Sequence, residues 1–109
     1  MYRVTTPTHI YTLPENANSY AEIQVTYRQK INGHKVKIVK HYQDETTPDG
    51  MSFDGKNVIA RLTQEETKQF GAEEPAHAQL RVLTSGGDSY TSQIFDIAVE
   101  QVLNEEILG

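Results

Sequence analysis

The stretch at residues 58–83 constrains the fold most, because its hydrophobic pattern changes twice within a short distance. Apolar residues first follow a period of two, which is typical of a β-strand, and this pattern stops at Leu62. The next four residues, Thr-Gln-Glu-Glu, fit a helical capping box in which Thr63 and Glu66 satisfy each other's backbone amides. Alternation then resumes in the second half of the stretch. The sequence therefore predicts two strands joined by one short helical turn near residues 63–70.

The expected end of this helical turn is Phe70-Gly71, with Gly71 in the left-handed conformation. A helix of about two turns is marginal on its own, so we expect Phe70 to anchor it on the core. Leu62 stands where a hydrophobic staple would begin, but the position it would pack against holds Thr67, a poor apolar partner. Glu65 and Glu66 are interpreted as residues that stabilise the helix N-terminus, not as a catalytic pair.

The clearest single strand is predicted at residues 20–28, and a return strand at residues 34–42. Asn32-Gly33 lies between them and is the strongest short hairpin signal, because both residues tolerate positive φ. One face of the first strand is predicted to be apolar, and it consists of Ala21, Ile23, Val25 and Tyr27. On the return strand Val36 and Ile38 share a face. A local basic cluster is expected on the solvent side of this ribbon: Arg28, Lys30, Lys35, Lys37 and Lys40.

The rest of the chain reads as further short strands and turns. Residues 1–6 are predicted to form an extended arm or edge strand, and residues 8–13 an edge strand between two prolines. Residues 43–57 are predicted to form a long loop with room for a short strand between its two Asp-Gly turns. The last strand is predicted at residues 90–103 with a bulge or strand end near Gln101, followed by a tail.

These elements predict one all-β domain over residues 1–109, with extended ends at residues 1–7 and 104–109. Short strands without a βαβ rhythm favour an antiparallel β-sandwich. A helical turn that bridges the two sheets late in the chain is common in immunoglobulin-like sandwiches, so the predicted class is an immunoglobulin-like antiparallel β-sandwich with one short helical turn near residues 63–70.

Composition excludes some functions and disfavours others. The chain has no cysteine, which excludes disulfides, thiolate nucleophiles and thiolate metal ligands. Its formal net charge of −5 disfavours non-specific nucleic-acid binding, which requires clustered Lys and Arg. The first residues contain no apolar segment of the signal-peptide kind, and no apolar run has transmembrane length. We therefore expect neither nucleic acid nor a membrane as partner.

No motif for chemistry stands out. The four histidines, His9, His34, His41 and His77, do not show metal-ligand spacing, although a zinc site shared between strands that includes His9 or His77 stays open. No serine lies in a nucleophile-elbow sequence, and Gly86-Gly87 lacks the lysine and helix of a phosphate loop. The sequence predicts a non-enzyme with no catalytic residue, cofactor or metal.

Six tyrosines provide the second candidate for a binding function. They lie at positions 2, 11, 20, 27, 42 and 90. An exposed aromatic stripe on a sandwich stacks on sugar rings, and tyrosine is also favoured at protein interfaces. The other interpretation is that these rings pack across strands and at the ends of the sheets.

Several segments resemble a family of short proteins from tailed phages and prophages of Gram-positive bacteria. The motifs that carry the resemblance span about residues 8–108: Val25-Thr26-Tyr27-Arg28-Gln29, the Leu-Thr-Gln-Glu-Glu-Thr of residues 62–67 with Phe70, the Gln-Leu-Arg-Val of residues 79–82, a glycine-containing turn, Ser92 and the Val-Glu-Gln-Val-Leu of residues 99–103. Some members are similar to the amino-terminal immunoglobulin-like domain of baseplate upper proteins. The motifs are structural, so no functional residue is carried over.

The resemblance implies a structural or assembly protein that acts by protein–protein contacts in the virion, in the tail, baseplate, neck or head. Its implied partners are other phage structural proteins or further copies of itself. Its implied location is the virion, or the bacterial host cytoplasm during assembly. A carbohydrate-binding module that uses surface tyrosines is the alternative expectation.

Overall fold

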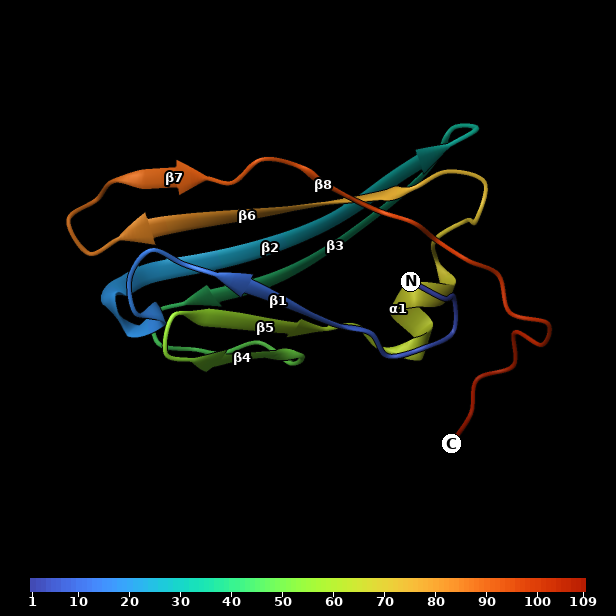
Figure 1. The fold of residues 1–109 in the computed structure, drawn as a ribbon, viewed down its shortest axis with the longest axis horizontal. Coiled ribbons are helices and arrows are strands. Elements are labelled where there is room, and N and C mark those ends of the chain that lie inside the picture. Colours follow the sequence, from blue (N-terminus) through green and yellow to red (C-terminus); the bar gives the residue numbers. More distant parts are fainter.

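The computed structural model describes residues 1–109 and consists mainly of β-strands (Figure 1). In chain order the elements are β1 Thr8–Thr12, the 3₁₀-helix η1 Ala17–Ser19, β2 Tyr20–Ile31, β3 His34–Gln43, β4 Met51–Asp54, β5 Asn57–Arg61, α1 Gln64–Lys68, β6 Ala76–Thr84, β7 Ser89–Thr91 and β8 Phe95–Ile97. Neither helix has the length and apolar character that crossing a bilayer requires.

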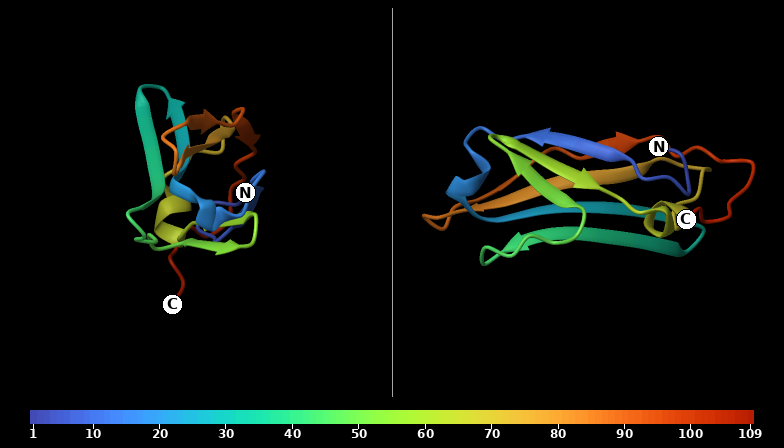
Figure 2. Two further views of the ribbon diagram at one scale, coloured as in Figure 1. Left: turned by 90° about the vertical axis from the view of Figure 1, so that its left-hand side faces the viewer. Right: turned by 90° about the horizontal axis from the view of Figure 1, so that it is seen from below.

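The strands form two antiparallel sheets. Three strands lie in the order β1-β5-β4, and five strands form the other sheet, in which β3, β2 and β6 are neighbours and both β7 and β8 pair with β6. Figures 1 and 2 show the sheets as two layers, with α1 at one end. One hydrophobic cluster includes Val58 and Ala60 of β5 together with Ile23 and Val25 of β2. The predicted two-sheet antiparallel architecture with one short helix is therefore confirmed.

The β2–β3 hairpin forms as predicted. Ile31 pairs with His34, and the turn residues Asn32 and Gly33 have φ values of 49° and 82°. The prediction for the start of β2 is wrong, because the register shifts between Tyr20 and Glu22. This irregularity turns Tyr20 into the core and leaves Ala21 exposed.

The segment over residues 43–57 contains a short strand, β4, between its two Asp-Gly turns. β4 forms a hairpin with β5, in which Asp54 pairs with Asn57 and the turn passes through Gly55 at φ 58°. Met51 is buried on the core side of β4, which explains why this short and polar segment stays in the sheet. β4 is thus the short strand that the sequence allowed between the two Asp-Gly turns, although a single buried residue in a strand of four gives almost no periodic signal.

The predicted strand over residues 90–103 is replaced by two separate strands of three residues, β7 and β8. Ser92 causes the interruption. Its backbone amide donates to the Leu80 carbonyl at 2.8 Å, while its hydroxyl, in place of a carbonyl, accepts from the Leu80 amide at 3.0 Å. The pairing Arg81 with Thr91 and then Ala78 with Phe95 leaves one extra residue on this edge, so the bulge lies here and not near Gln101.

The predicted capping box of α1 is confirmed. The Glu66 amide donates to the Thr63 hydroxyl at 3.1 Å, and the Thr63 amide donates to the Glu66 carboxylate at 2.9 Å. Phe70 follows the helix and is completely buried, as expected. Gly71 does not adopt the predicted left-handed conformation. Its amide instead donates to the side chain of Gln29 at 2.7 Å, and its carbonyl accepts from the same side chain at 2.8 Å.

Thr67 is a polar anchor and not an incomplete hydrophobic staple. Its side chain is fully buried. Its hydroxyl accepts from the Thr5 amide at 3.0 Å and lies 2.9 Å from the Thr5 carbonyl, to which it donates. The helix thus ties the N-terminal segment to the end of the core through hydrogen bonds that a methyl group could not make.

Phe70→Ala should lower the free energy of unfolding by about 3–5 kcal/mol, because it removes a fully buried ring and leaves a cavity. Urea denaturation at neutral pH measures this loss. The matched control is Phe95→Ala in β8, where the ring is 36% exposed and a clearly smaller loss is expected. An equal loss in both variants would contradict the anchoring role of Phe70.

The turn between Gln43 and Thr46 holds two acidic residues in an unfavourable backbone conformation. Asp44 and Glu45 have φ values of 51° and 62°, a region that favours glycine and asparagine. Glu45→Gly should therefore raise the stability by about 0.5–1 kcal/mol. Thermal unfolding tests this, with Asp49→Gly as control, since Asp49 has no positive φ and should gain nothing.

Candidate interaction surfaces

The outer face of the five-stranded sheet carries most of the predicted basic cluster. Strand alternation points Arg28 and Lys30 of β2 and Lys35 and Lys37 of β3 away from the core, and all four side chains are exposed. Arg81 of β6 is exposed on the same face. None of these five cations lies in an ion pair, although the chain is acidic as a whole. The solvent-side position predicted for these four cluster residues is confirmed.

The register places like charges directly opposite one another on this face. Arg28 pairs with Lys37, and Lys30 pairs with Lys35. Like charges on directly opposed residues lower the stability of an antiparallel pair. The face therefore carries a local energetic cost that an acidic contact surface would relieve.

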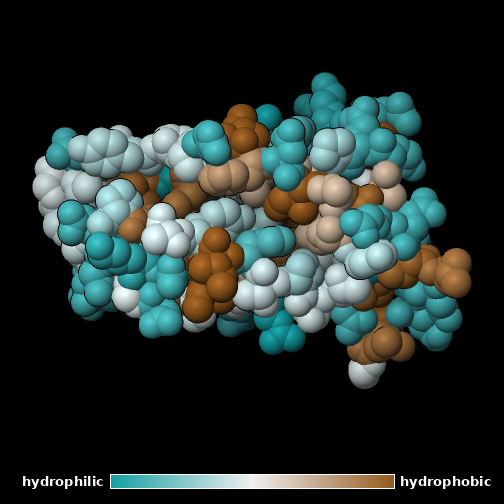
Figure 3. Space-filling view, viewed as in Figure 1, coloured by the Kyte–Doolittle hydropathy of each residue, from teal (hydrophilic) through white to brown (hydrophobic).

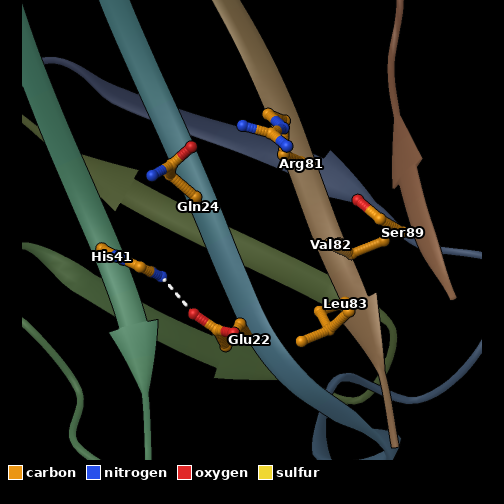
Figure 4. Close-up of a pocket in the computed structure, with 7 residues that line it drawn as sticks. All are labelled: Glu22, Gln24, His41, Arg81, Val82, Leu83 and Ser89. Atoms are coloured by element: carbon orange, nitrogen blue, oxygen red, sulfur yellow. Dashed lines mark hydrogen bonds and ion pairs between the residues drawn. The ribbon is translucent and has the colours of Figure 1, made fainter. Parts of the chain in front are cut away.

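Shallow depressions run along this face on both sides of β2. One is lined by Glu22, Gln24, His41 and Arg81 among others, and Figure 4 shows these side chains on three neighbouring strands. The dashed line marks the bond between His41 and Glu22, at 2.9 Å. A second depression shares Gln24 and Arg81 with the first and continues to Lys37. The two depressions share a border at Gln24 and Arg81 and lie beside the basic residues of this face.

Lys40 departs from the prediction and lies on the core side of β3, only 7% exposed. Its ammonium group donates to both carboxylate oxygens of Glu66, at 2.9 and 2.8 Å. Burial alone would raise the pKa of the Glu66 carboxyl, but the hydrogen bonds from Lys40 and Thr63 outweigh burial and hold the pKa below its ordinary value of 4.5. The carboxylate is therefore charged at neutral pH and serves the fold.

Glu66→Gln should cost about 2–3 kcal/mol at neutral pH, because it leaves the buried Lys40 ammonium without its counter-charge. Glu65→Gln, on the exposed side of the same helix turn, is the control and should cost less than about 1 kcal/mol.

The same pair predicts a pH dependence. A carboxyl with a lowered pKa in the folded state stabilises the protein above its ordinary pKa of 4.5, and this contribution is lost as the pH falls through the folded-state pKa. The difference in unfolding free energy between wild type and Glu66→Gln should thus shrink on acidification. A difference that stays constant from neutral to acidic pH would contradict the ion pair.

The histidines do not gather into a metal site. His41 binds Glu22, His77 binds Asp96 at 2.7 Å, and His9 lies 2.9 Å from the Tyr27 hydroxyl. No group of three or more His, Asp or Glu side chains is arranged to hold a metal ion. Each of the three bonded histidines thus has a single protein partner, and the shared site left open by the sequence is not formed.

His9, Tyr11 and Tyr27 form a partly buried hydrogen-bonded cluster between β1 and β2. The Tyr11 hydroxyl donates to the Tyr27 hydroxyl at 3.2 Å. Burial raises the pKa of Tyr27, and Tyr11 and Glu66 add to the effect. Burial also lowers the pKa of His9, assisted by the N-terminal amino group. All three groups are therefore neutral at physiological pH, and the cluster joins the two layers without a charge.

The tyrosines do not form an exposed stripe. Tyr20 and Tyr27 are buried, and Tyr11 and Tyr42 are partly buried. Only Tyr2 and Tyr90 are more than half exposed. Tyr2 lies near the N-terminus beside α1, whereas Tyr90 lies in β7 toward the opposite end (Figure 1). This arrangement counts against a sugar-stacking platform.

A second surface with apolar character lies at the seam between β1 and β8. Its lining includes Ile10 and Tyr11 of β1, Leu80 of β6 and Phe95 and Ile97 of β8. The C-terminal tail adds two strongly exposed residues: Leu103 and Leu108. Figure 3 shows hydrophobic side chains over this tail. Because Gln64 binds both the amide and the carbonyl of Leu108, the tail is held against α1.

Comparison with protein-family models finds no matching family for the chain. Comparison with curated proteins finds no significant match either. The resemblance to short phage proteins therefore stays a prediction that rests on the motifs quoted above.

The sequence identified the basic cluster but missed how it continues. Glu22, His41 and Arg81 line a depression beside the cluster, and they come from three neighbouring strands: β2, β3 and β6. When the pairing of the strands is known, alternation along each strand places these three side chains on the outer face. Without the pairing, no sequence pattern indicates that they lie close together.

Proposed function

We propose that this protein is a phage- or prophage-encoded structural or assembly protein that acts through protein–protein contacts in the virion, and that its two sheets form an immunoglobulin-like sandwich. Its place of action would be the tail, baseplate, neck or head, or the host cytoplasm during assembly. The proposal assigns no chemical reaction to the protein.

The observation that carries the proposal is the order in which the chain visits the two sheets. The chain changes sheet after β1, after β3 and after β5, and each change is followed by a hairpin: β2–β3, β4–β5 and β6–β7. Immunoglobulin variable-type domains place strands B, E and D in one sheet and C′, C, F and G in the other. The orders β1-β5-β4 and β3-β2-β6-β7 correspond to these two sets.

The helix supports the same assignment. In this correspondence α1 lies between strands E and F, where a helical turn is common in immunoglobulin-like sandwiches. The chain lacks the cysteine pair and the tryptophan of antibody domains. The correspondence therefore concerns the path of the chain and not the residues that mark antibody domains.

A fold by itself does not specify a function, so the surfaces carry the second part of the proposal. An unneutralised basic face, an apolar seam and a tail with exposed leucines are features that contact other proteins. The basic residues lie on β2 and β3, the apolar seam lies between β1 and β8, and the tail is bound to α1, which suits a component with more than one neighbour in an assembly.

Two measurements test the function. We expect the gene to lie among head, tail or lysis genes of a prophage, and we expect peptides of this protein in mass spectra of particles purified after prophage induction. Absence from particles with such gene neighbours would assign the protein to assembly and not to the mature virion. A position within a metabolic operon would overturn the proposal.

A further inference from the structure

The outer face of the β3-β2-β6 region has a charge gradient along the strands. On the strands, the half next to the Asn32–Gly33 turn carries four cations and one acidic residue: Arg28, Lys30, Lys35, Lys37 and Asp96. The exposed Glu73 and Glu74 lie at this end too, in the segment that leads into β6. On the strands, the half at the opposite end carries one cation and one acidic residue, Arg81 and Glu22, and the turns at this end add the exposed Asp44, Glu45 and Asp88. The strand register and Figure 1 place the turns that follow β3 and β6 at this same end.

An uncharged row separates the two halves. Thr26 of β2 lies in this row, flanked by Val39 of β3 and Gln79 of β6. Val39 is 39% exposed, although it is a β-branched apolar residue on a polar face. The face thus has an exposed apolar side chain near its centre. The two halves on either side of that centre carry opposite net charge.

From this pattern we propose that the face binds a second copy of the same chain. The two sheets would pack face to face, and the two-fold axis would lie in the plane between them and run perpendicular to the strands. Such an axis reverses the strand direction, so the positive half of each copy covers the negative half of the other. An axis parallel to the strands would instead place cations on cations. The charge gradient therefore selects both the occupant and its orientation.

The register makes the proposed contacts specific. Thr26 lies midway between Lys30 and Glu22 on β2, so reversal about Thr26 brings Lys30 of one copy to Glu22 of the second copy. On β6, Gln79 lies midway between His77 and Arg81. The neighbour of His77 on β8 is Asp96. The same reversal brings His77 of one copy to Arg81 of the second copy, with Asp96 on the strand beside His77. Val39 meets its own equivalent close to the axis.

The area of the face indicates which size class of interface the dimer would have. Three strands at about 4.8 Å spacing and about 40 Å length offer roughly 550 Å² per copy, or about 1,100 Å² in total. This is the low end for specific protein interfaces, so we expect a weak dimer whose affinity depends strongly on salt. The inference goes beyond the proposed function, because it concerns a contact between copies whatever the virion partners are.

Sedimentation equilibrium of the whole chain at high micromolar concentration tests the dimer. We expect dimers at low ionic strength and monomers at about 0.5 M salt, where the Debye length is only a few ångströms. Lys35→Glu with Lys37→Glu should remove the dimer at low salt. Because Lys37→Glu turns a like-charge pair with Arg28 into an attractive one, this variant should be at least as stable as wild type.

A charge swap distinguishes this contact from any other. Asp44→Lys with Glu45→Lys makes both halves positive and should also abolish self-association. Mixing this variant with Lys35→Glu/Lys37→Glu should restore a one-to-one complex at low salt. Circular dichroism and thermal unfolding of each variant alone verify that the exposed substitutions leave the fold intact.

Chemical cross-linking tests the orientation. The chain has no cysteine, so a single Val39→Cys variant can be joined by a short bis-maleimide only to another copy. We expect efficient linkage for Val39→Cys at low salt and little for the control Ile10→Cys, which is exposed on the other sheet. A monomeric wild type under all salt conditions, failure of the mixed variants to associate, or equal linkage in both cysteine variants would overturn the proposal.

Discussion

A largely buried ion pair between Lys40 of β3 and Glu66 of α1 is the contact on which the end of the molecule depends. α1 has only five residues, and a helix of that length does not persist in water by itself. Glu66 stabilises it twice, by capping its own N-terminus and by binding a lysine of the neighbouring sheet. The helix is therefore fixed to the five-stranded sheet while its chain continues from the three-stranded one.

Two further polar anchors complete this end. Thr67 binds the backbone of Thr5 and holds the N-terminal segment. Gln29 binds the backbone of Gly71 and Glu74 and holds the chain that leaves the helix. Each anchor is a buried polar side chain with its hydrogen-bonding groups paired, so burial costs little and the geometry is specific. Phe70, which follows the helix and is completely buried, joins this end to the hydrophobic core.

The two faces of the five-stranded sheet have different roles. Its inner face packs apolar side chains and one paired lysine, whereas its outer face presents cations that no acidic residue neutralises. Cross-strand repulsion between Arg28 and Lys37 lowers the stability of the isolated protein. A surface that carries such a cost while the core is well packed is a natural place for a charged partner.

Local patterns were sufficient for the elements whose signals lie within a few residues. Alternation predicted β2, β3 and β6, the Asn-Gly turn predicted the hairpin, and the spacing of Thr63 and Glu66 predicted the capping box. The core position of Lys40 also follows from alternation with Val36 and Ile38, but its charge suggested solvent, because only the tertiary structure supplies Glu66 as a partner.

The sequence alone therefore determined the types of the main secondary-structure elements and which side chains of the longer strands share a face. Both depend on the periodicity of apolar residues and on residues that are close in the chain. The tertiary structure decided the bulge at Ser92, the conformation of Gly71 and the charge gradient across three strands. Each of these depends on a pairing register or on a buried partner distant in the chain, and no local pattern encodes either.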